Sequence, residues 1–152
     1  KWLSDQLDIP VIGPETMTGK ISTRAEWIKN DVVDILRGGV GDLGGLTPLM
    51  KVAHLAESFN MAMEVHGGKE GNLHALGSMR LPGEFYERGL LHPHVDYEKP
   101  PDYLHEIMDP MDEEGFIHMP KGDGLGWKIN HDYINDNLIS GNDNKEKARR
   151  SY

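Results

Sequence analysis

Residues 62–68, Ala-Met-Glu-Val-His-Gly-Gly, predict a short buried strand that ends in a histidine and a glycine-rich turn. Because side chains alternate along a strand, Ala62, Glu64 and His66 are expected to share one face. The strand would hold the imidazole rigidly, while the two glycines leave it open to a ligand. Taken alone, a histidine in this position is more often a rim residue that bonds a neighbouring carbonyl. The role of His66 therefore has to be inferred from the rest of the sequence.

Strands and helices alternate on both sides of this stretch. Short apolar or β-branched runs, bounded by glycine, proline or charged residues, predict strands at residues 9–13, 32–36, 62–66 and 84–87. Helices are predicted between them at residues 23–30, 47–59 and, more weakly, 72–79. The first would begin with the capping box 23–26, and the second with Thr47 as N-cap and Pro48 at the first helical position. This alternation predicts right-handed crossovers and a parallel sheet.

The spacing of the predicted strands is close to the roughly 30 residues of one β/α unit in an eight-stranded barrel. Four strands are half of such a barrel, and a free half would leave two long edges unpaired. The residues alone therefore leave two alternatives, an open α/β sheet or half of a barrel.

The character of the sequence changes after residue 90. Residues 91–140 are rich in proline and glycine, and we expect them to form an extension that packs on the barrel or its capping domain. Residues 141–152 are polar and are expected to form a solvated tail. The predicted division is thus 1–90, 91–140 and 141–152.

Composition narrows the class of protein. The chain has 152 residues, which suits one domain, and a net charge of −9, which argues against a nucleic-acid surface. No stretch approaches the roughly 18 apolar residues of a membrane span, and no basic, apolar leader stands at the N-terminus. The chain has no cysteine, which is consistent with a reducing cytoplasm. We therefore expect a cytoplasmic protein without a nucleic-acid or membrane partner.

Four ionisable residues fall at the carboxyl ends of the predicted strands, where barrel enzymes place their chemistry. They are Glu15, Arg37, His66 and Glu87. Each has an ordinary structural interpretation: a helix cap for Glu15, a surface ion pair for Arg37, and rim positions for His66 and Glu87. Together, however, two acids and a base at equivalent strand ends would lie close to one another at the mouth of the barrel, the edge where the strands end.

The segment 34–66, with Gly-Asp-Leu-Gly-Gly-Leu-Thr-Pro at residues 41–48, resembles the enolase superfamily. More narrowly, it is similar to the mandelate racemase/muconate lactonizing enzyme-like group, which includes many sugar-acid dehydratases. Supporting pieces are Ile-Pro-Val-Ile-Gly-Pro-Glu at 9–15, Phe-Tyr-Glu-Arg-Gly at 85–89 and Gly-Leu-Gly-Trp-Lys-Ile-Asn at 124–130. The resemblance covers residues 1 to about 140 in order. It implies an α/β fold, a (β/α) barrel of TIM type of which only the C-terminal half is seen, strands five to eight plus a C-terminal extension.

The resemblance also implies site roles. Glu15 matches a carboxylate ligand of Mg²⁺, His66 a general acid or base, and Glu87 a group that hydrogen-bonds the substrate carboxylate as it becomes an enediolate. Arg37 is placed to contact an anionic substrate. Oxygen ligands suit Mg²⁺, and an imidazole suits proton transfer near neutrality. To donate a hydrogen bond, Glu87 would need a raised pKa.

The sequence departs from the family pattern in two ways. The family often pairs its histidine with an aspartate at the end of the sixth strand, but that position here is Gly39. The pair is therefore expected to be absent or built differently, with Asp42 further along the turn and Glu64 on the histidine's own strand. This departure favours dehydration over racemisation or cycloisomerisation.

The second departure is that two metal ligands and a lysine base of the family lie in the first half of its chain. We therefore expect the N-terminal half of the same protein as a partner, a small sugar acid as substrate and a homo-oligomer. A non-catalytic barrel fragment that needs a partner chain is the alternative from another class.

Overall fold

The computed structural model describes residues 1–17, 20–68, 71–83, 85–88 and 99–139. Three parallel strands form its sheet, in the order β1 (Ile12–Gly13), β2 (Ile35–Gly38) and β3 (Met63–Val65). Ile12 lies opposite Ile35, and Leu36 lies opposite Met63. The predicted parallel α/β arrangement is confirmed.

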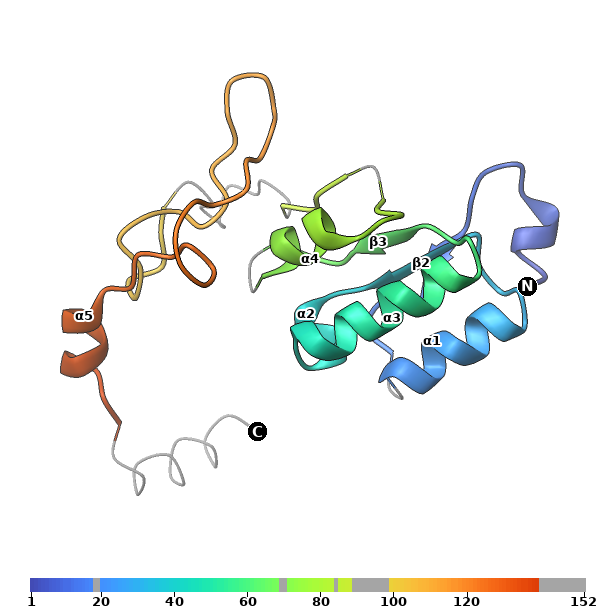
Figure 1. Ribbon diagram of the computed structural model, residues 1–152, viewed down its shortest axis with the longest axis horizontal. Helices are drawn as coiled ribbons and strands as arrows, with labels where there is room; N and C mark the ends of the chain where they lie inside the picture. Colours follow the sequence, from blue (N-terminus) through green and yellow to red (C-terminus); the bar gives the residue numbers. More distant parts are fainter. Residues whose placement is uncertain (18–19, 69–70, 84, 89–98, 140–152) are drawn as a thin grey trace.

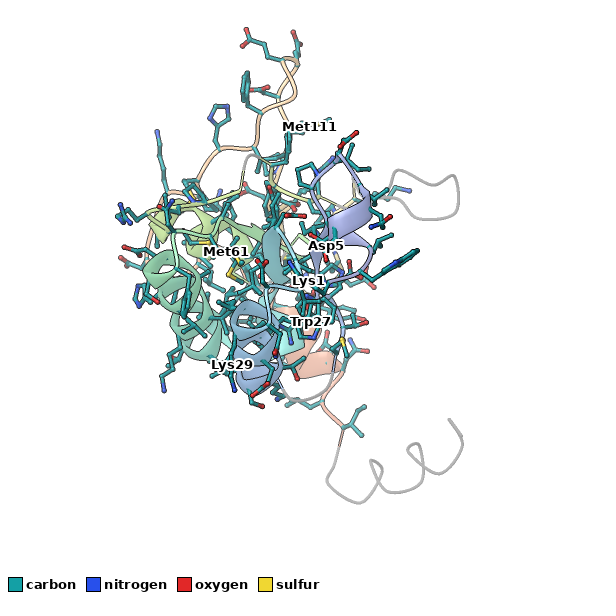
Figure 2. The ribbon with its side chains drawn as sticks, turned by 90° about the vertical axis from the view of Figure 1, so that its right-hand side faces the viewer. Lys1, Asp5, Trp27, Lys29, Met61 and Met111 are labelled. Carbon is teal, nitrogen blue, oxygen red and sulfur yellow. The ribbon has the colours of Figure 1, made fainter. Side chains whose placement is uncertain are left out.

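The helices connect and cover these strands. They are a 3₁₀ turn η1 (Ser4–Gln6), α1 (Lys20–Lys29), α2 (Val40–Leu43), α3 (Leu46–Ser58), α4 (Asn72–Ser78) and α5 (His131–Asp136). Figure 1 shows α1 and α3 running side by side along one face of the sheet, with α5 at the far end of the molecule. The N-terminal turn is held by Lys1, whose ammonium lies 3.0 Å from Asp5 and 2.6 Å from Asp31. Figure 2 labels Lys1 and Asp5 beside α1.

The hydrophobic core lies between the sheet and these helices. Leu36, Met63 and Val65 point into it from the strands, because alternate residues of β2 and β3 are buried. The helix α3 contributes an apolar stripe with helical spacing, formed by Leu49, Val52, Ala53 and Ala56. Full burial of each large side chain contributes about 1.5–3 kcal/mol to stability.

The other face of the sheet borders a cavity of about 720 Å³. Its lining includes Ile35 and Arg37 from β2, Ala62 and Glu64 from the β3 segment, and Glu87. Ala62 and Glu64 therefore share a face, as their spacing predicts, whereas His66, predicted on the same face, is not among the residues that line this cavity. Two ionisable residues of the candidate site, Arg37 and Glu87, border this cavity.

Two predicted helix starts are wrong. Helix α1 already includes Lys20, so the capping box predicted at 23–26 lies inside the helix, where no free helix-start amides remain. Helix α3 begins at Leu46 with Gly45 as N-cap, so Thr47 is in its first turn. The start of α3 is set by the turn between α2 and α3, where Gly44 and Gly45 adopt φ values of 84° and 139° that favour glycine.

The predicted fourth strand is not formed in residues 85–88. Instead, a single parallel bridge joins Met63 to Pro82, and the Gly83 amide donates to the Met63 carbonyl at 2.7 Å. Residue 84, residues 89–98 and the predicted tail 141–152 lie outside the described residues. The extension over 99–139 is mostly irregular, with antiparallel bridges that join Leu104 to Ile129 and Met111 to Ile117.

Met111 lies near the outer part of the extension, away from Trp27 and Lys29 of α1 (Figure 2). In the ranges that the structure describes, no helix is both long and apolar enough to cross a membrane.

Candidate active site

The four predicted strand-end residues lie together. Glu15 follows β1, Arg37 is in β2, His66 directly follows β3, and Glu87 follows the bridge at Pro82. Arg37 Nε lies 3.0 Å from Glu15 Oε2, and His66 Nε2 lies 3.3 Å from Glu15 Oε1. Arg37 Nη2 also donates a hydrogen bond to Glu87 Oε2. Parallel strands bring their carboxyl ends to one edge of a sheet, which explains why residues so far apart in sequence meet.

His66 is held between two carboxylates. Its Nδ1 lies 2.7 Å from Asp42 Oδ2, and its Nε2 faces Glu15. The Asp42 side chain is only 12% exposed, so this contact is largely shielded from water. Asp42 Oδ2 is placed to accept a hydrogen bond from an Nδ1–H group, and in that tautomer Nε2 is the nitrogen at the mouth. The pair is therefore built differently from the family pattern, with Asp42 as its acid.

Gly39 explains why the acid is not at the expected position. A Cβ atom at Gly39 would lie 2.4 Å from the His66 carbonyl oxygen and 3.2 Å from Asp42 Oδ2. Any side chain there would push the two turns apart. Instead, Asp42, three residues after Gly39 in the short helix α2, places its carboxylate beside the His66 imidazole. Glu64 lies elsewhere, since its carboxylate packs against Gly83.

Asn72, which the sequence did not single out, joins the two turns that carry Asp42 and His66. It is buried at the start of α4. Its side-chain oxygen accepts from the Val40 amide at 2.8 Å, while its nitrogen donates to the carbonyls of His66 and Gly67 at 3.0 and 2.9 Å. Its only sequence signal is a polar residue after glycine at a helix start. Asn72 thus fixes α2 relative to the histidine.

Arg24, inside the misassigned capping box, is a second residue that sequence reasoning missed. Its guanidinium is fully buried and donates to the carbonyls of Pro14, Glu15 and Arg37, as well as to those of Met17 and Lys20. Burial lowers the pKa of Arg24, while the nearby Asp42 carboxylate acts in the opposite direction. Arg24 therefore ties together the ends of β1 and β2, next to Glu15 and Arg37.

The Glu87 carboxylate accepts hydrogen bonds from Arg37 and from the Gly67 amide. Burial acts to raise its pKa, but the Gly67 amide, the Arg37 guanidinium and His66 outweigh burial, so the pKa is lowered from its ordinary value. The Gly67 amide donates to Glu87 Oε2 at 2.9 Å. The raised pKa expected from the sequence is wrong here, because the sequence did not show that Arg37 bridges Glu15 and Glu87.

The lowered pKa predicts how acid affects stability. Because the folded-state pKa of Glu87 lies below the unfolded value near 4.5, its contribution is complete above that value and is lost as pH falls through the folded pKa. We expect Glu87→Gln to remove part of the stability loss below about pH 4.5, as measured by urea unfolding at several pH values. The exposed Glu113→Gln is the matched control. Identical pH profiles for wild type and Glu87→Gln would contradict the assignment.

The metal-ligating capacity of the described residues is small. No three histidine, aspartate or glutamate side chains in this part of the chain are grouped so as to hold a metal ion. Glu15 offers a carboxylate at the mouth, with 49% of its side chain exposed, while the Glu87 carboxylate is paired with Arg37. Mg²⁺ is commonly bound by one or two carboxylates together with water and substrate oxygens. Glu15 therefore fits one ligand position of a site completed from outside these residues.

A parallel sheet with ionisable side chains gathered at the carboxyl ends of its strands is the arrangement of an α/β enzyme domain. The chain belongs to the enolase C-terminal domain-like family, whose sequence model matches residues 1–133.

Similar proteins include dehydratases. The D-glucarate dehydratase from Agrobacterium tumefaciens, crystallised with magnesium, is 51% identical over 91% of this chain, with a TM-score of 0.84. A D-galactonate dehydratase family member from Enterocloster bolteae is 31% identical over 70 residues, which are 44% of this chain. A mandelate racemase/muconate lactonizing enzyme from Polaromonas sp. JS666 is 25% identical over 86% of this chain, with a TM-score of 0.61.

The matched regions are minor parts of these relatives. The chain covers 36% of the glucarate dehydratase, 33% of the Polaromonas enzyme and 16% of the galactonate dehydratase family member. The relatives are therefore much longer than the segment that they share with this chain.

Proposed function

We propose that this chain is the C-terminal half of the barrel of a magnesium-dependent sugar-acid dehydratase. The observation that carries the acid–base part of the proposal is the imidazole of His66, which Asp42 holds at 2.7 Å and which presents Nε2 to the mouth beside Glu15. A histidine whose other nitrogen is fixed by a carboxylate is suited to proton transfer at a defined atom. The 51% identity to a D-glucarate dehydratase supports a sugar diacid or related acid as the substrate class.

The proposed reaction removes water from a 2,3-dihydroxy acid. A base takes the α-proton, and the resulting enediolate expels the β-hydroxyl, which leaves as water after receiving a proton from Nε2 of the His66 imidazolium, whose Nδ1–H remains on Asp42. The enol that remains tautomerises to a 2-keto-3-deoxy acid. Proton transfer by a positioned side chain contributes typically 10²–10⁴-fold to the rate. The role of Asp42 is to keep the imidazole oriented while its proton is transferred.

Arg37 and Glu87 are proposed to receive the substrate carboxylate. In the structure Arg37 bridges Glu15 and Glu87, with its side chain 17% exposed. An incoming carboxylate offers Arg37 a new partner, and bidentate pairing with carboxylates is the geometry that arginine favours. Release of Glu87 from Arg37 would remove one cause of its lowered pKa, so that Glu87 could take up a proton and donate to the developing enediolate.

Glu15 is proposed as the Mg²⁺ ligand that this chain supplies. When bound, the ion would supply positive charge that stabilises the dianionic enediolate. We expect Glu15→Gln in the complete protein to weaken Mg²⁺ binding about tenfold or more, as measured by isothermal titration calorimetry without substrate. The matched control is the exposed Glu26→Gln on α1. Equal Mg²⁺ affinity for Glu15→Gln and wild type would remove Glu15 from the ligand set.

The remaining ligands and the α-proton base are proposed to come from the N-terminal half of the same protein. The cavity of about 720 Å³ on the face of the sheet opposite α1 and α3 is consistent with this partner, because a closed barrel would cover that face. The division into a half-barrel (1–90), an extension (91–140) and a tail (141–152) remains a prediction, as do the homo-oligomer and the cytoplasmic location.

A panel of sugar acids tests the function. The complete protein is incubated with each acid and Mg²⁺, and 2-keto acid formation is followed as the semicarbazone. We expect turnover of at least one hexaric or hexonic acid, and none after Mg²⁺ is chelated. Absence of keto-acid formation from the whole panel would contradict the proposal.

A racemase or cycloisomerase of the same superfamily is the second candidate. The Asp42–His66 pair favours it more than the sequence did, because the apparent absence of a histidine–aspartate pair was the argument against racemisation. The match to a mandelate racemase/muconate lactonizing enzyme also supports it. The preference for dehydration now rests on the greater identity to a dehydratase.

A further inference from the structure

Glu87 lies in the segment 85–88, which forms no strand in the part of the chain that the structure describes. Residues 85–88 are irregular, although Glu87 reaches the centre of the site through Arg37 and the Gly67 amide. Something other than a sheet ladder must therefore place its carboxylate. The residues on either side, Tyr86 and Arg88, both turn to the same partner in the C-terminal extension.

That partner is Asp109, a buried acid that is 7% exposed. Tyr86 donates its hydroxyl hydrogen to Asp109 Oδ2 at 2.9 Å, and Arg88 Nε donates to the Asp109 main-chain carbonyl at 3.0 Å. Arg88 Nε also lies 3.9 Å from Asp109 Oδ1. A buried carboxylate is costly unless it is paired, so these contacts fix all three residues relative to one another.

The contacts of Asp109 extend to the turn that follows His66. A Cβ atom at Gly68 would lie 2.8 Å from Asp109 Oδ2, 3.1 Å from the Tyr86 hydroxyl and 3.2 Å from the Glu87 carbonyl oxygen. Gly68 is thus packed directly against this group, two residues after His66. The extension, the segment 85–88 and the turn after β3 therefore pack together around the buried Asp109 side chain.

We propose that Asp109 is a positioning residue of the site: through Tyr86 and Arg88 it sets the place of Glu87 against Gly67 and Arg37. The inference rests on the proposed function for its catalytic consequence, since Glu87 is the group proposed to contact substrate. It assigns the C-terminal extension a direct part in building the site.

The Gly67 amide reports the position of Glu87 without any assay of activity, because it donates to Glu87 Oε2. Asp109→Asn and Tyr86→Phe, each in the complete protein, are expected to raise hydrogen exchange at Gly67 about tenfold. The Leu36 amide, which donates to the Ala62 carbonyl in the centre of the sheet, should be unchanged. Asp102→Asn, an equal change of charge at an exposed position of the extension, is the control for both amides.

On a substrate that wild type turns over, we expect the two variants to lower kcat roughly 10–100-fold with a smaller change in KM. The double variant should lose no more than the stronger single one, since both changes act on the same contact between Tyr86 and Asp109: the first weakens its acceptor and the second removes its donor. Unchanged Gly67 exchange, or equally faster exchange at Leu36, overturns the positioning role. Faster Gly67 exchange with an undiminished kcat would show that the positioning of Glu87 by Asp109 has no catalytic consequence. A wild type that turns over none of the sugar acids contradicts the proposed function, and Gly67 exchange still decides whether Asp109 places Glu87.

Discussion

Replacement of His66 by asparagine in the complete protein is expected to lower kcat on the sugar-acid substrate by about 10²–10⁴-fold. Asparagine preserves a polar side chain of similar length but cannot transfer a proton near neutrality. In the structure His66 Nε2 is the nitrogen at the mouth, because Asp42 occupies Nδ1 at 2.7 Å. The loss should therefore appear in kcat, with a smaller change in KM. Steady-state kinetics on the best substrate of the panel measure both.

Two further variants separate proton transfer from general disturbance. Asp42→Asn keeps the shape of the side chain but removes the charge that orients the imidazole, so a smaller loss of kcat in the same direction is expected. His54→Asn changes an exposed histidine on α3 and should leave kcat unaltered. Full turnover by the His66 variant would exclude it as an acid or base.

The second large effect is expected for Arg24→Met, which should lower the free energy of unfolding by about 3 kcal/mol or more. Methionine fills much of the volume but cannot hydrogen-bond. It would leave the carbonyls of Pro14, Glu15 and Arg37 without their buried donor. Urea unfolding of the complete protein, followed by circular dichroism, measures the change.

Arg80→Met is the matched control for this prediction. Arg80 lies 2.6 Å from Glu57, but its side chain is 66% exposed, and exposed ion pairs contribute about 0–1 kcal/mol. Equal unfolding midpoints for the two variants would show that the buried guanidinium does not hold the strand ends. Because Arg24 bonds the Glu15 carbonyl, weaker Mg²⁺ binding by Arg24→Met is expected as well.

The positions of Glu15, Arg37 and His66 could be predicted from the sequence because strand ends are a property of periodicity and of glycine-rich turns. Alternation in 62–66 placed Ala62 and Glu64 on one face, and the cavity lining agrees. The family resemblance then added roles that spacing alone could not give, and the match of residues 1–133 confirms the family.

Contacts between segments distant in sequence could not be predicted in the same way. The partner of His66 is Asp42 because a Cβ at position 39 would meet the His66 carbonyl, a distance that only the folded turns define. Likewise, the lowered pKa of Glu87 depends on the Gly67 amide and on Arg37, which lie 20 and 50 residues away in the sequence. The helix start at Lys20 was missed because Thr23 and Glu26 have the spacing of a capping box, although they lie inside the helix.

The measurement that tests the central claim most directly is the fate of the α-proton and the β-hydroxyl in deuterium oxide. The complete protein, with Mg²⁺, is given D-glucarate first, because a D-glucarate dehydratase is 51% identical to this chain, and ¹H NMR follows substrate and product. We predict stoichiometric conversion to a 2-keto-3-deoxy acid with deuterium at C3, where the enol is protonated. Entry of deuterium at the α-carbon of recovered substrate, with no loss of water from this or any other acid of the panel, would contradict the dehydratase account and identify a racemase.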